Sequence, residues 1–184
     1  MQSIKVGELM VPVAEYAAVS EEATLYDAVL ALEEAQKKIL QEHQKYWSVL
    51  VLDKNQRVVG KIGRWDILMA IEPRYKRVKE LKETSRFGFS PEFYKSMLED
   101  HGLWRNPLED LCKKAAAVKV KEIMTTPAEG KYIAADASLN EAIHRVVTGK
   151  YQSLLVMRGE TIVGVLLLSD IYRYVCDRIK VCRI

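Results

Sequence analysis

The chain has 184 residues, of which 49% are hydrophobic and 29% are charged, and a formal net charge of +3. This length suffices to bury a sizeable core in one domain or in two closely packed small ones, and the composition excludes wholesale disorder. The small net charge does not indicate a nucleic-acid partner, and no apolar run is long enough to cross a bilayer.

A six-residue lead-in occurs twice. The first is KVGELM at Lys5–Met10 and the second is KVKEIM at Lys119–Met124, so four of the six positions are identical. The offset between Met10 and Met124 also aligns Ala23-Thr24-Leu25 with Ala137-Ser138-Leu139. Because agreement at a fixed spacing is the mark of an internal duplication, the sequence predicts two copies of one structural unit.

The first half of each copy predicts a strand followed by a helix. Extended segments are expected around 16–19 and 132–134, and helices are expected to start near Ser20 and Asp136, where short polar side chains can cap backbone N–H groups. In the first copy the apolar spacing continues the helix through Leu25 and Leu32 to beyond Ala35.

The second half of each copy predicts two strands and a helix. The first copy has strands at 47–52 and 58–62, joined by a polar turn, and then a helix from Asp66. The second copy repeats this with strands at 154–157 and 162–168 and a helix from Asp170. Each copy therefore has the order β-α-β-β-α, which indicates an α+β fold.

The two copies are separated by a long insert. We expect boundaries at 1–71 for the first repeat, 72–118 for the insert and 119–184 for the second repeat. An insert of this length should contain structure of its own, and helices are expected around 77–83, 91–100 and 107–117. Its basic residues alternate with acidic ones, which favours a solvated helix face over a nucleic-acid surface. These basic residues are Arg74, Lys76, Arg77, Lys79, Lys82 and Arg86.

With its lead-in ending in Met, its Ala-Thr/Ser-Leu segment and its closing Gly…Asp-Ile segment, each copy resembles the cystathionine beta-synthase (CBS) domain. A tandem pair of such domains is called a Bateman module. The resemblance implies that the repeats pack through their sheets about a pseudo-twofold axis and leave two clefts. It also implies regulation rather than catalysis, binding of AMP, ADP, ATP or S-adenosylmethionine without a required cofactor, a homodimer, and a regulated protein partner that the sequence does not identify.

Two aspartates are the principal candidate ligand residues. Asp66 and Asp170 lie near the start of the last helix of each copy, where a carboxylate could accept hydrogen bonds from ribose hydroxyls and the helix N-terminus could face a phosphate. Because Asp is also favoured there for capping alone, each could be structural only.

Residues beside the two aspartates give a mixed indication. The family often has Thr or Ser three residues before the Asp, whereas this chain has Gly63 and Leu167. Lys61 and Arg64 could instead meet phosphate, or could be ordinary surface charges, and Ser169 could contact a ligand or cap the helix.

The resemblance places adenine against the extended segments 13–19 and 126–134. The candidates there are Tyr16 and Ala17 in the first copy and Tyr132 and Ile133 in the second. For Tyr16, Tyr132 and the nearby Trp65, packing in a core or interface is favoured over stacking on a ligand.

No catalytic or metal motif is present in the sequence. The histidines at 43, 101 and 144 share no metal-ligand spacing, and Cys112, Cys176 and Cys182 form neither a disulfide framework nor a CxxC motif. We therefore expect reduced thiols in a cytoplasmic protein that is not an enzyme and does not associate with a membrane. The alternative to a ligand sensor is a ligand-free structural or dimerisation module that acts through protein contacts, with the insert supplying a binding surface.

Overall fold

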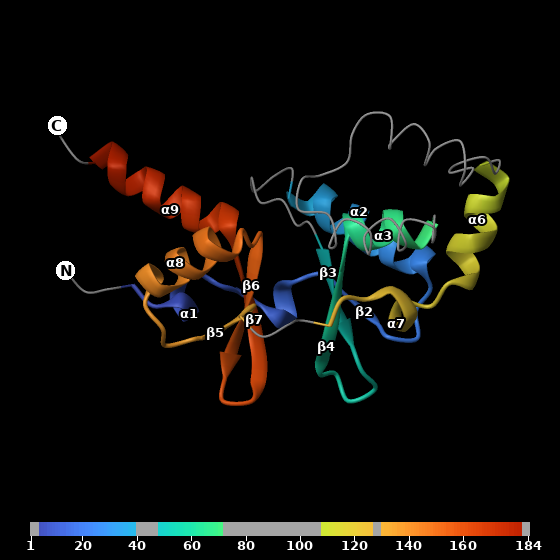
Figure 1. Ribbon diagram of the computed structural model, residues 1–184, viewed down its shortest axis with the longest axis horizontal. Coiled ribbons are helices and arrows are strands. Elements are labelled where there is room, and N and C mark those ends of the chain that lie inside the picture. The colour runs from blue at the N-terminus through green and yellow to red at the C-terminus, as the bar shows by residue number, and fades with distance from the viewer. Residues whose placement is uncertain (1–3, 40–47, 72–107, 127–129, 182–184) are drawn as a thin grey trace, which may run out of the picture.

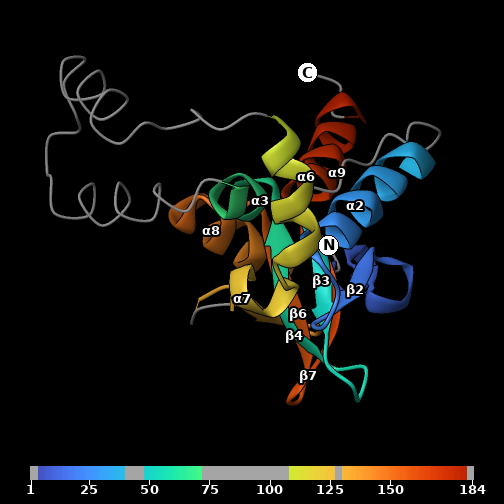
Figure 2. The same cartoon turned by 90° about the vertical axis from the view of Figure 1, so that its right-hand side faces the viewer.

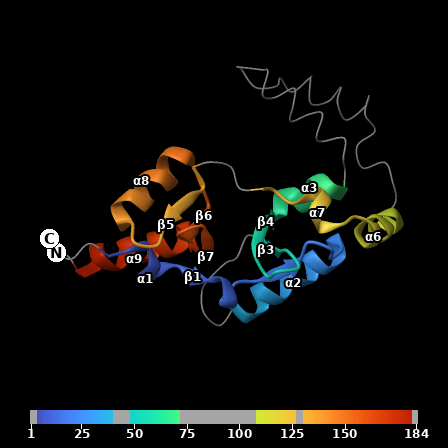
Figure 3. The same cartoon turned by 90° about the horizontal axis from the view of Figure 1, so that it is seen from below.

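The computed structural model describes residues 4–39, 48–71, 108–126 and 130–181. Two small sheets lie side by side, and each carries helices of its own on the outside, as Figures 1 and 3 show. This arrangement confirms the predicted α+β fold class. None of the helices in the described ranges is both long and apolar enough to span a bilayer.

The first repeat has the predicted β-α-β-β-α order. Its elements are β2 (Ala18–Ser20), α2 (Leu25–Ile39), β3 (Ser48–Leu52), β4 (Val58–Gly63) and α3 (Arg64–Ile71). Strand β3 lies in the middle of a three-stranded sheet, where it pairs in parallel with β2 and antiparallel with β4.

The second repeat copies this order. Its elements are β5 (Tyr132–Ala134), α8 (Leu139–Gly149), β6 (Ser153–Arg158), β7 (Thr161–Leu167) and α9 (Leu168–Val181). Strand β6 pairs in parallel with β5 and antiparallel with β7, as β3 does with its neighbours. The duplication seen in the sequence is therefore a duplication of strand pairing.

The predicted starts of the first helices are wrong by a few residues. Helix α2 begins at Leu25, because Thr24 and Asp27 bond reciprocally: the Thr24 hydroxyl accepts from the Asp27 N–H, and Asp27 accepts from the Thr24 N–H. Helix α8 begins after Ser138, whose hydroxyl accepts from the Glu141 N–H. Ser20 instead stabilises the preceding turn by accepting from the N–H of Glu22.

The two lead-ins are exchanged between the repeats. Helix α1 (Val6–Leu9) packs on the second repeat, where the N–H of Val6 donates to Ala137 and the N–H of Gly7 donates to Ala135. Helix α7 (Val120–Ile123) packs on the first repeat, where the N–H of Val120 donates to Ala23. Figure 1 shows α1 beneath α8 and α7 beside β4. Each repeat in the sequence thus completes its neighbour in space.

Strand pairing follows the same exchange. Strand β1 (Val11–Pro12), which is followed by the short helix η1 (Val13–Glu15), joins the edge of β7 with Val11 opposite Val165. At the corresponding place in the first repeat, Thr125 pairs with Lys61 of β4 through two backbone hydrogen bonds. These equivalent pairs relate the two repeats by the expected pseudo-twofold axis.

The core has three layers, which the alternation along the strands explains. Val49 and Val51 of β3 face the helices of the first repeat, and Leu154 and Val156 of β6 face those of the second. Leu50 of β3 and Leu155 of β6 alternate with these residues and face the opposite sheet. The layer between the sheets contains Val11, Tyr16, Ala35, Leu50, Leu155, Val165 and Leu167.

One helix of the insert lies within the described residues. Helix α6 (Leu108–Ala117) matches the prediction for 107–117 and packs against α2 and α3, as Figure 2 shows. The Lys114 ammonium donates to the carbonyl oxygen of Ile71 at 3.4 Å. The helices predicted at 77–83 and 91–100, and the basic residues at 74–86, lie outside the described residues.

A glycine–methionine contact explains two elements of the repeated motif. A Cβ atom added to Gly60 would lie 2.7 Å from the sulfur of Met124, and one added to Gly164 would lie 2.6 Å from the sulfur of Met10. The Cβ on Gly164 would also lie 2.7 Å from the backbone oxygen of Val11. The exchanged lead-in can therefore approach each sheet only where the strand has no side chain.

Substitution of these glycines should destabilise the fold unequally. We expect Gly164→Ala to lower the free energy of unfolding by about 1–3 kcal/mol, and Gly60→Ala by less, because the new Cβ would lie 2.7 Å from the Val11 backbone oxygen in the former and 3.3 Å from the Thr125 backbone oxygen in the latter. Urea denaturation in a double-mutant cycle with Met10→Ala or Met124→Ala measures the contact. Removing the methionine should reduce the loss of stability caused by Gly60→Ala more than that caused by Gly164→Ala. Losses in the free energy of unfolding that are additive in both cycles would contradict the glycine–methionine contact.

Candidate functional site

A cavity of about 580 Å³ lies between the two repeats beside the start of α3. This volume is in the range of small-molecule sites, which is roughly 300–1,000 Å³. The first repeat contributes Tyr16, Ser48, Lys61, Gly63, Arg64, Trp65, Asp66 and Leu68. The second contributes Thr125, Lys131, Gln152, Ser153 and Leu167. Five of the predicted site residues therefore line one cavity: Tyr16, Lys61, Gly63, Arg64 and Asp66.

Asp66 bridges the start of α3 and the second lead-in. One carboxylate oxygen accepts from the N–H of Gly63 at 2.8 Å, and the other accepts from the hydroxyl of Thr125 at 2.8 Å. The first bond satisfies a backbone donor just before α3 and explains why the helix begins at Arg64, ahead of Asp66. Since a carboxylate offers about four acceptor sites, Asp66 can still accept hydrogen bonds from a ligand.

Lys61 and Lys131 give the cavity a concentrated positive charge. The Lys61 ammonium donates to the Ser153 hydroxyl of the other repeat at 3.1 Å. Burial lowers the pKa of Lys61, and the charge of Lys131 lowers it further, whereas Asp66 acts in the opposite direction. Because crowding of two cations is unfavourable, an anion bound between them would be stabilised.

Two aromatic side chains line this cavity and differ in their burial. Tyr16 is buried, and its hydroxyl shares a 3.2 Å hydrogen bond with the hydroxyl of Ser48, so it is part of the packed wall. Trp65 lines the same cavity but is 79% exposed, so its ring is not part of the core of this chain.

The equivalent position in the second repeat has a different environment. Asp170 is only 6% exposed, and neither of its carboxylate oxygens has a hydrogen-bond partner among the described residues. Val11 occupies the place that Thr125 has beside Asp66, and Leu167 replaces Gly63. Burial raises the pKa of Asp170, although Arg173 at 3.8 Å acts against that rise. Asp170 lines neither of the two cavities described in this subsection.

The remaining predicted residues lie away from the first cavity. Ile133 is buried under the helices of the second repeat, and Ala17 packs in the layers around β3. Ser169 is partly buried in the first turn of α9. Their roles in ligand binding stay predictions.

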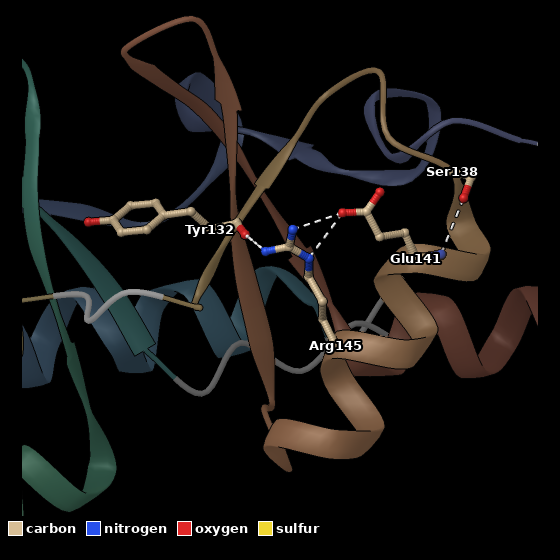
Figure 4. Close-up of polar contacts among 4 residues, drawn as sticks. All are labelled: Tyr132, Ser138, Glu141 and Arg145. Atoms are coloured by element: carbon tan, nitrogen blue, oxygen red, sulfur yellow. Dashed lines mark hydrogen bonds and ion pairs between the residues drawn. The ribbon is translucent and has the colours of Figure 1, made fainter.

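Tyr132 contributes its backbone to a separate contact. The Arg145 guanidinium donates to the carbonyl oxygen of Tyr132 at 2.8 Å and also pairs with Glu141 at 2.8 Å. Figure 4 shows the ring of Tyr132 pointing away from Arg145. Tyr132 and Ile133 line a second cavity of about 740 Å³, formed with α1 on the outside of the second repeat.

Sequence reasoning missed several residues of the first cavity. Ser48 and Ser153 occupy equivalent positions in the two copies, which is a signal that both face the space between the repeats. Thr125 directly follows the second lead-in, so it could be assigned to Asp66 only once the exchange of lead-ins is known. No cluster of three potential metal ligands occurs in the described part of the chain.

Exchanging the residues beside the two aspartates should change stability in opposite directions. We expect Val11→Thr to raise the free energy of unfolding at neutral pH by about 1 kcal/mol, because its hydroxyl can donate to ionised Asp170. Thr125→Val should lower it by a similar amount. Chemical denaturation of both variants and the parent protein measures the difference.

The pH dependence of Val11→Thr separates this explanation from general packing. Because the raised pKa of Asp170 marks a penalty on its charged form, the gain should be largest above that pKa and fade as the group protonates toward pH 3.8. A gain that does not vary with pH, or a loss at neutral pH, would contradict the assignment.

Comparison with known proteins agrees with this geometry. The family model for the CBS domain matches residues 6–73 and 120–177, which is more than half of the chain. No curated protein matches significantly.

Solved structures cover almost the whole chain. The CBS-pair protein CBSX2 from Arabidopsis thaliana has 17% identity and a TM-score of 0.62, over 97% of this chain and 99% of that one. A putative acetoin utilization protein from Vibrio cholerae has 19% identity and a TM-score of 0.61, over 97% and 95%. CBSX2 in complex with AMP has 16% identity and a TM-score of 0.53, over 96% and 98%. The chain belongs to the CBS-domain family and carries two CBS domains in tandem.

Proposed function

We propose that this tandem CBS protein is a regulatory sensor that binds one adenosine nucleotide in the cavity beside Asp66. CBS-pair modules are in general regulatory and sense ligands rather than catalyse reactions. The observation that carries the proposal is the position of Asp66, whose carboxylate lines a cavity of suitable size beside Lys61 and Arg64. The structurally similar CBSX2 has been solved in complex with AMP, which supports an adenosine ligand.

Each part of a nucleotide has a partner in this cavity. The ribose hydroxyls would donate to Asp66, which retains acceptor capacity beyond its bonds to Gly63 and Thr125. Phosphate would lie near Lys61, Lys131 and the first turn of α3. The adenine would lie along the wall that contains Tyr16. AMP, ADP, ATP and S-adenosylmethionine are the candidate ligands.

Ligand binding would be coupled to the arrangement of the repeats. The cavity is formed by both copies, and two polar contacts already cross it: Thr125 to Asp66 and Lys61 to Ser153. A ligand that engages Asp66 and Lys61 would change the balance of these contacts. It can shift the shape of the module only by its difference in affinity for the alternative arrangements.

Titration calorimetry tests the proposal. We expect AMP, ADP or ATP to bind with a stoichiometry of one per chain and to raise the melting temperature of the protein. Asp66→Ala should abolish binding, and Asp170→Ala should leave it intact because Asp170 lies outside the cavity. The absence of heat and of any thermal shift with all four candidate ligands would exclude nucleotide sensing, and loss of binding in Asp170→Ala alone would place the ligand elsewhere.

We also propose that the protein forms a homodimer through its helices. The exposed large hydrophobic residues of the described chain all lie on α2, α3, α8 and α9. Figure 1 shows these helices along the same side of the molecule. They are Tyr26, Leu30, Trp65, Leu68, Val147, Tyr172, Ile179 and Val181. Exposed apolar surface of this kind favours association.

Charge introduced on this surface should weaken association. We expect Leu30→Glu together with Tyr172→Glu to shift sedimentation from dimer to monomer, with Lys54→Glu, in the turn after β3, as the control. Monomeric parent protein at all concentrations, or a dimer that resists the double substitution, would contradict the proposed interface.

A further inference from the structure

We propose that the Asp66 cavity selects its nucleotide by charge, with Lys61 and Lys131 forming a phosphate seat that favours AMP over adenosine and disfavours S-adenosylmethionine. This inference rests on the proposed function, because it concerns the ligand class of the same cavity. It narrows the four candidates to those that carry phosphate.

The charge of the lining residues gives the direction of selection. Among the described residues that line the cavity, Lys61, Arg64 and Lys131 carry positive charges and Asp66 is the single acidic residue, which is an excess of two positive charges. A phosphate monoester brings roughly −1.5 to −2 at neutral pH. S-adenosylmethionine has a sulfonium and an ammonium group against one carboxylate, so it would add positive charge to a positive site.

The phosphate seat is held in place before any ligand arrives. The Lys61 ammonium is fixed at 3.1 Å from the Ser153 hydroxyl, although Lys131 repels it and burial disfavours its charge. An ammonium has three N–H donors and the bond to Ser153 uses one, so Lys61 can also donate to a phosphate oxygen. The cavity thus contains a cation whose unfavourable environment an anion would relieve.

The seat is formed from both repeats and occurs on one side of the axis only. Lys61 lies on β4, and Lys131 directly precedes β5 of the other repeat. Their counterparts across the pseudo-twofold axis are Val165 and Ala17, which are apolar and lie in or against the core layer between the sheets. The aspartate is duplicated but the seat is not.

The binding constants of AMP, adenosine and S-adenosylmethionine, which differ in charge, test whether the cavity selects its ligand by charge. We expect the parent protein to bind AMP at least about tenfold more tightly than adenosine, which corresponds to roughly 1.4 kcal/mol, and S-adenosylmethionine more weakly than AMP. Lys131→Gln and Lys61→Gln should each lower the affinity for AMP about tenfold and change the affinity for adenosine little. Lys54→Gln, in the turn after β3, is the matched control for loss of a lysine.

The dependence of affinity on salt concentration gives a second test, which can be made on the parent protein without the variants. AMP affinity should fall between low and high ionic strength and adenosine affinity should not. Melting curves establish that each variant is folded before its affinity is compared.

The outcomes distinguish the two proposals. Equal affinity for AMP and adenosine, or S-adenosylmethionine bound as tightly as AMP, would overturn charge selection and leave nucleotide sensing intact. An AMP preference that survives both lysine substitutions would overturn the assignment of the seat. Failure of the folded parent protein to bind any of the three compounds, and to bind ADP or ATP, would overturn both proposals.

Discussion

The exchange of lead-ins between the repeats holds the two sheets together. Neither sheet completes its packing alone, because Val6 from the first lead-in is buried in the core of the second repeat and Val120 from the second lead-in is buried in that of the first. The exchange brings the residue after each lead-in to the edge of the opposite sheet, at the position that contacts the aspartate in the first repeat. In one case that residue is Thr125 and in the other it is Val11. The cavity therefore exists only when both repeats are folded together.

The two repeats share their backbone structure but differ in the side chains around the two aspartates. Both repeats use the same strand pairing, the same glycine contact with methionine and an aspartate in the first turn of the last helix. Asp66 accepts hydrogen bonds from Gly63 and Thr125, whereas Leu167 and Val11 occupy the equivalent positions in the second repeat and Arg173 lies 3.8 Å from Asp170. Neither carboxylate oxygen of Asp170 has a hydrogen-bond partner among the described residues, so the two aspartates occupy the same place in the repeat but differ in their surroundings.

This asymmetry also makes the two sides of the pseudo-twofold axis different. One side of the pseudo-twofold axis presents a charged cavity, and on the other side the counterparts of Lys61 and Lys131 are Val165 and Ala17, in or against the core layer between the sheets. A ligand in the cavity would contact strands and loops of both repeats, so its binding energy would act across their interface. That is the physical requirement for a module that reports occupancy to a partner.

The repeated motif made the order of elements predictable, because period and spacing survive in both copies. It could not reveal that each lead-in serves the other repeat, since that is a long-range pairing with no local signature. The helix starts were misplaced because Ser20 forms a turn and Thr24, with Asp27, forms the cap. Lys61, Gly63, Arg64 and Asp66 could be assigned to one cleft from the sequence because the resemblance to the CBS domain implies a cleft beside Asp66. Lys131 and Ser153 could not be joined to them, because only the tertiary fold brings them together.

We propose that one cavity, built by two repeats, binds one nucleotide. A crystal structure of the protein grown with AMP would show whether it does. We expect the ribose beside Asp66, the phosphate between Lys61 and Lys131, and no nucleotide beside Asp170. Nucleotide bound at Asp170, or an Asp66 cavity that stays empty at saturating AMP, would contradict it.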